Sequence, residues 1–248
     1  MNPLRRRIQT AMQQGGGAAA FSPTDIAGLQ LWLDASQITG LNDGDAVAAM
    51  TDYSASSGDL AQGTASKRPT YKTAIKNGLP VVRFDGVDDT LGNSSWTALD
   101  GLTGATQFAV AKQFYNGGGD VFFYSNGRLT LQQFIGERYY YQSAGNSGRV
   151  ATASGQWIVD CVVFDGSQVG NAARLVAFQN AVQQTLTFTG TIGASLSTST
   201  GYQLSGVNTV PIAPQQADFA ELLIYNRVLT SQERAKVLDY LNGKWAIY

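Results

Sequence analysis

The chain of 248 residues contains no histidine and only one cysteine, Cys161. The absence of histidine excludes Ser-His-Asp and Cys-His nucleophilic centres, histidine acid–base catalysis and metal sites built from imidazole. A single cysteine forms no internal disulfide, so the fold is not a disulfide-stabilised scaffold. Cys161 lies within the apolar run 158–164. Because free cysteine packs as a small hydrophobe, we expect a buried thiol.

Charged side chains are also scarce, at 14% of the chain against about 25% in typical soluble domains. Only three glutamates are present, Glu137, Glu221 and Glu233. Retaining glycosidases need two carboxyl groups about 5 Å apart. None of these glutamates is spaced as such a pair, and Asp160 is isolated among core residues. Together with the absence of histidine, this predicts a protein that is not an enzyme.

Long apolar runs are missing as well. No stretch approaches the roughly 18 apolar residues of a membrane span, so we expect no transmembrane segment. Glutamine and threonine interrupt residues 8–14, which therefore lack the apolar segment of a signal peptide. The sequence predicts that the protein stays in the cytoplasm of the cell that makes it until assembly or lysis.

Positive charge is concentrated at the N-terminus. Residues 1–24 hold three arginines and no acid, whereas the rest of the chain holds 14 of the 17 basic side chains and all 18 acidic ones. Nucleic-acid binding depends on basic patches that neutralise phosphates. The body of the protein has a net charge of −4 and offers no such patch, so we expect no nucleic-acid partner.

The N-terminal residues 1–20 form a separate arm in the predicted domain organisation, followed by one domain over 21–248. Residues 3–14 have helical apolar spacing, and a Gly/Ala linker follows over 15–20. One interpretation is a docking arm, in which an apolar stripe fills a groove and arginines meet an acidic surface of a protein partner; the alternative is a frayed terminus. The residues of this predicted docking arm are Leu4, Arg5, Arg6, Arg7, Ile8 and Met12.

From residue 21 onward the pattern is typical of strands and turns. The clearest signal is Asn126-Gly127 between two apolar runs, because a type I′ hairpin turn needs positive φ. A capping box at Thr230 and Glu233 begins one helix, whose C-terminal end we place near Gly243. The expected strands are 29–33, 80–84, 107–114, 121–124, 128–131, 138–142, 157–164, 174–178, 182–188 and 219–225, and the apolar face of the helix is Val237, Leu238, Leu241 and Trp245.

Several segments together carry a resemblance to a known family. The longest are Leu-Gln-Leu-Trp-Leu-Asp-Ala-Ser at 29–36, Gly-Leu-Pro-Val-Val-Arg-Phe-Asp-Gly-Val-Asp-Asp at 78–89, and Phe-Ala-Glu-Leu-Leu-Ile-Tyr-Asn-Arg-Val-Leu-Thr at 219–230, and shorter ones lie at 43–47, 51–54 and 68–71. With their surroundings, over about residues 26–246, they resemble the laminin-G-like jelly-roll domain of the concanavalin A-like lectin and glucanase superfamily. The resemblance implies an all-β, two-sheet jelly-roll sandwich, with a sugar partner and homo-oligomers as expectations. Such domains occur in bacterial surface proteins and in virion proteins of bacteriophages.

Aromatic side chains are the candidates for contact with a sugar. Tyr139 and Tyr141 share one face of their strand, with Tyr140 on the other. Tyr115 lies in an aromatic and amide-containing loop, and Trp96 follows a polar stretch. Sugars stack on exposed rings while nearby polar groups hold their hydroxyls. We therefore consider Trp96, Tyr115, Tyr139 and Tyr141 as possible glycan contacts, with core packing or subunit contact as the alternative for each.

Asp85, Asp88 and Asp89 form the densest acidic group in the sequence. Calcium takes six to eight oxygen ligands, often from carboxylates and carbonyls in a turn. Aspartate is also common in turns because its side chain bonds the backbone two residues on. The interpretation as turn residues is favoured, so no metal or other cofactor is expected. If calcium binds, Asp85, Asp88 and Asp89 are the candidate ligands.

These observations give three functional hypotheses. The first is a non-enzymatic virion surface protein of a bacteriophage, either a capsid decoration or a tail-associated protein, which its arm anchors to other virion proteins. The alternative is a carbohydrate-binding adhesion module of a phage or bacterial surface protein, whose partners are host-surface glycans. The third is a glycoside hydrolase, which the scarcity of paired carboxylates argues against. The first hypothesis places the protein in the virion.

Overall fold

The computed structural model describes residues 21–115, 121–124, 128–134, 136–143, 145–198, 201–205 and 215–248. The predicted arm over residues 1–20 and the predicted turn at Asn126-Gly127 lie outside these residues. No helix in the described part is long and apolar enough to cross a membrane.

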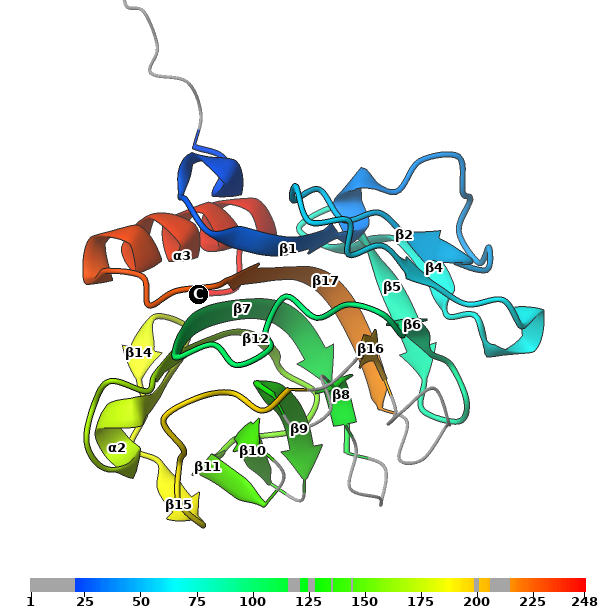
Figure 1. Cartoon of the computed structure of the whole chain (residues 1–248). Coiled ribbons are helices and arrows are strands. Elements are labelled where there is room, and N and C mark those ends of the chain that lie inside the picture. The colour runs from blue at the N-terminus through cyan, green and yellow to red at the C-terminus, as the bar shows by residue number, and fades with distance from the viewer. Residues whose placement is uncertain are drawn as a thin grey trace, which may run out of the picture.

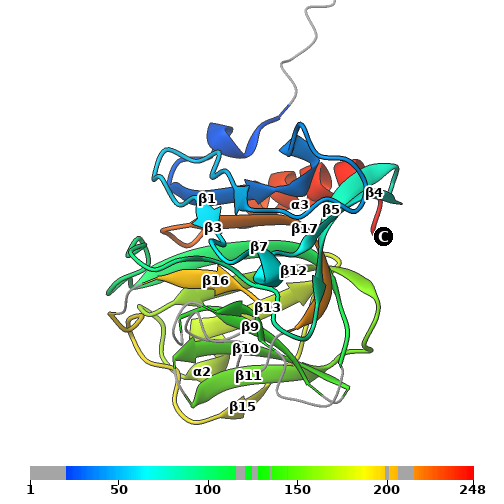
Figure 2. The same ribbon diagram turned by 90° about the vertical axis from the view of Figure 1, so that its right-hand side faces the viewer.

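Two antiparallel sheets pack face to face, and a C-terminal helix covers the outer side of one of them (Figure 1). Figure 2 shows the same layers from a view turned by 90°. Sheet A of the described chain consists, in spatial order, of β14 (Val182–Gln183), β13 (Leu175–Gln179), β12 (Trp157–Asp165), β7 (Gly104–Gln113), β17 (Gln216–Tyr225), β5 (Leu79–Asp85) and β4 (Thr70–Lys76), with β1 (Leu29–Asp34) also pairing with β17. The all-β sandwich predicted from the sequence is confirmed.

Sheet B lies opposite. Its described strands are, in spatial order, β15 (Thr187–Thr189), β11 (Asn146–Ala151), β10 (Glu137–Ser143), β9 (Thr130–Phe134), β8 (Val121–Tyr124), β16 (Tyr202–Leu204), β6 (Leu91–Asn93), β3 (Leu60–Ala61) and β2 (Ala49–Met50). The helical elements described are α2 (Asn171–Arg174), α3 (Ser231–Trp245) and the 3-10 turns η1 (Pro23–Asp25), η2 (Ala35–Gln37) and η3 (Ala65–Lys67).

The sandwich contains two apolar layers, one between the sheets and one between sheet A and α3. Strand β12 contributes to both: Val162 and Phe164 face sheet B, while Val159 and Cys161 face the helix side. A strand that is covered on both faces is apolar at successive positions, which explains the continuous run in the sequence. Cys161 is fully buried, as predicted, and burial raises the pKa of its thiol.

One predicted strand was wrong. Asn180 and Ala181 have positive φ and form the expected hairpin turn between β13 and β14. However, 182–188 does not continue as a single strand, because β14 ends at Gln183 and β15 pairs with β11 in sheet B. The chain thus crosses from one sheet to the other within a segment whose apolar pattern looks uniform.

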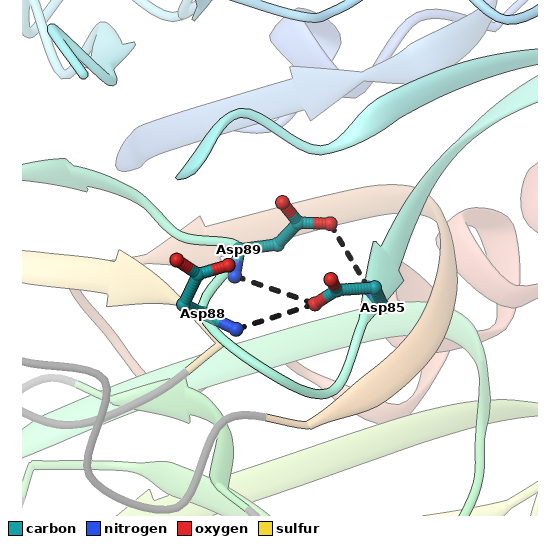
Figure 3. Close-up of side chains that lie close together, drawn as sticks. All are labelled: Asp85, Asp88 and Asp89. Carbon is teal, nitrogen blue, oxygen red and sulfur yellow. Dashed lines mark hydrogen bonds between the residues drawn. The ribbon is translucent and has the colours of Figure 1, made fainter. Parts of the chain in front are cut away.

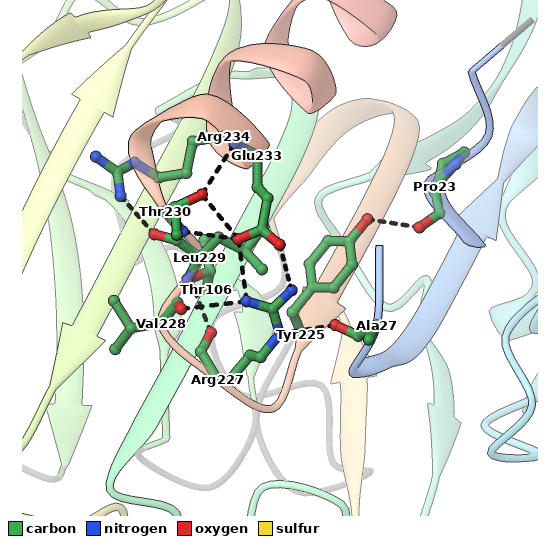
Figure 4. A network of polar contacts seen from close by, with 10 residues as sticks. All are labelled: Pro23, Ala27, Thr106, Tyr225, Arg227, Val228, Leu229, Thr230, Glu233 and Arg234. Carbon is green, nitrogen blue, oxygen red and sulfur yellow. Dashed lines mark hydrogen bonds and ion pairs between the residues drawn. The ribbon is translucent and has the colours of Figure 1, made fainter. Parts of the chain in front are cut away.

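Helix α3 begins at the predicted capping box. The Thr230 hydroxyl accepts from the Glu233 amide, and the Glu233 carboxylate accepts from the Thr230 amide. Arg227 binds both Glu233 oxygens, at 2.6 and 3.0 Å (Figure 4). This guanidinium, followed by the Thr230 amide, lowers the pKa of Glu233 to about 2. Helix α3 ends at Trp245, close to the predicted end near Gly243, and Ala246 follows it in the left-handed conformation.

The segment before β1 is held against this region. The Tyr225 hydroxyl donates to the Pro23 carbonyl at 3.0 Å, and Arg227 Nε donates to the Ala27 carbonyl at 2.9 Å (Figure 4). Residues 23–27 are therefore fixed beside the start of α3.

Candidate functional site

The outer face of sheet B carries a connected group of aromatic rings. Along β10, Tyr140 is buried between the sheets, whereas Tyr139 and Tyr141 are half-buried on the opposite face, as predicted. Their rings stack at 5.8 Å between centroids with 16° between planes. Phe134, at the end of β9, meets Tyr139 edge-on at 6.3 Å, and Tyr115 meets Phe134 at 5.6 Å. We call Tyr115, Phe134, Tyr139 and Tyr141 the aromatic strip.

Two charged side chains flank the strip. Arg149 on β11 lies opposite Tyr139 in the strand register, with its guanidinium 5.8 Å from the ring centroid. Arg149 also pairs with Glu137 at 3.4 Å, and the Tyr139 hydroxyl donates to Glu137 at 3.0 Å. Both charged side chains keep 36% of their surface exposed. The pair therefore holds the Tyr139 ring in place and still presents donors and acceptors to solvent.

The strip combines ring faces with fixed polar groups, the combination that orients a sugar or another polar ligand with apolar faces. Phe134 is 36% exposed, which is unusual for a large apolar ring. Burial raises the pKa of the Tyr141 phenol, which keeps this hydroxyl protonated and able to donate. These properties suit reversible binding of a neutral or weakly charged ligand and supply no nucleophile.

Three members of the strip are predicted from the sequence, and Phe134 is not. The predicted strand ends at residue 131, whereas β9 runs to Phe134 and places Gln132 and Phe134 on the outer face. Continuing the alternation past residue 131 to Gln132 and Phe134 would have predicted the outward position of Phe134. The contact between Tyr115 and Phe134 joins the end of β7 to β9, and no local pattern predicts that contact.

Trp96 does not belong to this surface. Its ring is only 4% exposed and packs at 4.5 Å against Tyr202 in the core between the sheets. The polar residues before it belong to the end of β6 and to the following turn, so the ring turns inward while its neighbours stay in solvent. The prediction that Trp96 is an exposed sugar contact was wrong.

The acidic group at 85–89 forms a hydrogen-bonded turn after β5 (Figure 3). Asp85 Oδ1 accepts from the amides of Val87, Asp88 and Asp89 at 2.8, 3.3 and 3.4 Å, and Asp89 Oδ2 accepts from the Asp85 amide at 3.0 Å. One oxygen from each of Asp85, Asp88 and Asp89 lies within 4.8 Å of the others. Burial, followed by the charges of Asp85 and Asp88, raises the pKa of Asp89 to about 6. The backbone bonds account for Asp85 and Asp89 as turn residues.

The fold creates a carboxylate pair that spacing along the sequence did not predict. Asp34 on β1 and Glu221 on β17 are register partners, and Lys244 of α3 donates to both. Both carboxylates are fully buried beneath the helix. Burial, followed by the charge of Asp34, raises the pKa of Glu221, against the effect of Lys244. The pair therefore belongs to an internal cluster that connects β1 and β17 to α3 through Lys244.

Asp160 is not isolated, in contrast to the sequence-based expectation. It reaches across the sandwich to Arg138 on β10, and the Tyr140 hydroxyl donates to it at 2.7 Å. The side chains of Arg138 and Asp160 are 1% and 2% exposed. This ion pair connects the two sheets and is closed to solvent.

No family model matches the chain, and no curated protein is similar to it in sequence. Solved structures share its fold. The binding domain of Paraclostridial Mosquitocidal Protein 1 matches with a TM-score of 0.58 and 12% identity, over 87% of this chain and 53% of that one. The binding domain of botulinum neurotoxin serotype G matches with a TM-score of 0.57 and 8% identity, over 86% and 51%.

A third similar structure is the ligand-binding domain of botulinum neurotoxin serotype D in complex with N-acetylneuraminic acid. Its TM-score is 0.54 at 8% identity, over 86% of this chain and 51% of that one. The chain thus spans about half the length of these binding domains. At such low identity the likeness establishes a shared β-sandwich fold and carries no residue across.

Proposed function

We propose that this protein is a non-catalytic glycan-binding module that holds sugars on the aromatic strip of sheet B. The observation that carries the proposal is the stacked pair Tyr139 and Tyr141, continued by Phe134 and flanked by the exposed Glu137–Arg149 pair. Rings of this kind contact the apolar faces of a sugar, while the charged groups bind its hydroxyls. The similarity in fold to toxin binding domains, one of them in complex with N-acetylneuraminic acid, supports the same function.

The proposal includes no catalysis. In the described chain, Asp34 and Glu221 are covered by α3, Asp160 is closed between the sheets, and Glu137 is paired with Arg149. None of these carboxyl groups faces a second, solvent-accessible carboxyl group, as a retaining glycosidase requires.

Anchoring in a bacteriophage virion remains a prediction from the sequence. It depends on residues 1–20, including Leu4, Ile8 and Met12, which lie outside the described residues. Deleting residues 1–20 should abolish incorporation into a virion while leaving a folded domain. Normal incorporation of the truncated protein would contradict the anchoring hypothesis.

A glycan array tests the proposed function. The full chain should bind a defined subset of glycans, and Tyr141→Ala should weaken the best ligand by about two- to tenfold, since a ring contact contributes about 0.5–1.5 kcal/mol. Tyr248→Ala is the matched control, because Tyr248 is 49% exposed and lies outside the strip. Equal binding by both variants, or no binding by the wild type, would contradict the proposal.

A further inference from the structure

A second feature of the outer face of sheet B is a polar hollow over β3, β6 and β16. Its floor is formed by Ala61, Gly92 and Gln203, which are neighbours in the strand register. Their strand neighbours Leu60, Leu91 and Leu204 are buried in the core between the sheets. Because side chains alternate along a strand, Ala61, Gly92 and Gln203 face outward.

The hollow exists because two of the three floor positions carry almost no side chain. Glycine inside a strand weakens it and often marks a place where a ligand approaches the backbone. Gly92 does not have positive φ, and a Cβ there would meet the Gln203 Cβ at 3.3 Å. The backbone conformation therefore does not require glycine at position 92; what glycine provides there is space.

The rim of the hollow consists of hydrogen-bond donors and one cation. Thr64, Thr90 and Ser94 contribute hydroxyls, and Lys67 contributes an ammonium group. Thr90 Oγ1 accepts from Gln62 Nε2 at 2.6 Å, which leaves the Thr90 proton available to a ligand. None of the lining residues is acidic.

Lys67 is the decisive group. Within the described chain its ammonium makes no ion pair, hydrogen bond or ring contact, in contrast to Lys72, which binds Asp43, and Lys244, which binds Asp34 and Glu221. The side chain is half-buried at the edge of the hollow. A cation without a counter-ion, beside three hydroxyls, is complementary to a small anionic group.

We propose that this hollow binds the anionic substituent, a carboxylate or a sulfate, of an acidic glycan. The inference rests on the proposed function, because it takes the ligand to be a glycan. The hollow has a volume of about 210 Å³, below the roughly 300–1,000 Å³ of pockets for drug-sized ligands, so it suits one substituent or one sugar ring. In the strand order it lies three spacings from Phe134 on β9, about 14 Å, and four spacings from Tyr139 and Tyr141 on β10, about 19 Å. One oligosaccharide that contacts both places must span this distance.

Amide NMR of the full chain, titrated with lactose, sialyllactose and sulfated lactose, tests this inference. We expect the amides of Thr64, Lys67 and Ser94 to shift with an acidic sugar and not with lactose, while those of Tyr139 and Tyr141 shift with both. A response to only one acidic sugar identifies the substituent as carboxylate or sulfate. Lys67→Ala should weaken the acidic ligand by about fivefold, with lactose unchanged. Lys236→Ala, at an exposed position on α3, is the control.

A steric variant gives an independent readout. Gly92→Leu should fill the hollow and abolish the preference for acidic over neutral sugar. The control is Gly243→Leu, at a position where an added Cβ meets nothing within 4 Å. This variant should keep the preference for acidic sugar. Amide shifts in the strip without shifts in the hollow would overturn this inference and keep the proposed function. Shifts in the hollow without shifts in the strip would overturn the binding of a glycan to the strip and keep an anion site in the hollow. No shift at either place would overturn both proposals.

Discussion

Asp34 on β1 and Glu221 on β17 face each other across paired strands and share Lys244, which reaches them from α3. Glu221 accepts two further hydrogen bonds from the helix, from Tyr240 at 2.8 Å and from Trp245 at 2.7 Å. Two buried carboxylates and one ammonium group therefore connect the last helix to the first strand, and this cluster explains how the C-terminal helix is positioned on sheet A.

Replacing this lysine should destabilise the protein strongly. Lys244→Met leaves two carboxylates buried without their cation, and breaking a buried ion pair costs about 3 kcal/mol or more. Urea unfolding should show this loss at pH 8 and a smaller loss at pH 5, because the raised pKa of Glu221 favours its neutral form. Lys236→Met, on the exposed side of α3, is the control. A loss equal to that of the control would mean that the cluster does not hold the helix.

The ion pair between the sheets should behave as a unit. Arg138→Leu leaves Asp160 charged and buried, at a cost of about 3–5 kcal/mol in the free energy of unfolding. Adding Asp160→Leu removes the orphaned charge, so the double variant should be more stable than Arg138→Leu alone. Chemical unfolding of the wild type, Arg138→Leu, Asp160→Leu and the double variant measures the coupling energy. Additive losses would show that Arg138 and Asp160 contribute separately.

Asp89 should make stability depend on pH. Its folded-state pKa of about 6 exceeds the usual aspartate value of 3.8, so the folded protein resists an ionisation that the unfolded chain undergoes freely. Its effect therefore lowers stability as pH rises from about 4 to about 6. Asp89→Asn should remove this loss and raise the melting temperature relative to wild type at pH 7.5 but not at pH 4.

The same melting curves test the turn interpretation of the acidic group. Asp239→Asn, at an exposed position on α3, is the control and should give no such gain. Millimolar calcium should leave the wild-type melting temperature unchanged. A rise with calcium that Asp89→Asn abolishes would instead show that Asp85, Asp88 and Asp89 form a cation site.

Cys161 should be inert in the folded protein. It is fully buried on β12, and burial raises the pKa of its thiol, so the reactive thiolate is scarce. A thiol reagent such as DTNB should label it only at the rate of unfolding, and fully in denaturant. Rapid labelling of the native protein would place the thiol at the surface.

The sequence predicts those elements in which local pattern and tertiary environment agree. The continuous apolar run of β12 predicts a strand covered on both faces, and Thr230 with Glu233 predicts the start of α3. Strand β11, Asn146–Ala151, is polar and contains Gly148, so its pairing with β10 follows from its neighbours rather than from its own residues. Local pattern alone did not identify it as a strand.

The candidate site follows the same rule. The alternation of Tyr139, Tyr140 and Tyr141 predicts which rings face outward, because it depends only on the geometry of a strand. The burial of Trp96 was not predicted, because polar neighbours at the end of a strand do not determine which way a side chain points. The hollow at Gly92 needs three strands brought together from residues 60–61, 91–93 and 202–204, and no spacing along the chain predicts that arrangement.

The central claim is that the aromatic strip binds a glycan. The most direct test is a crystal structure of the full chain with the strongest ligand from a glycan array. The account predicts a sugar ring over the faces of Tyr139 and Tyr141, with its hydroxyls bonded to Glu137 or Arg149. A sugar bound elsewhere, with the strip open to solvent, would contradict the claim.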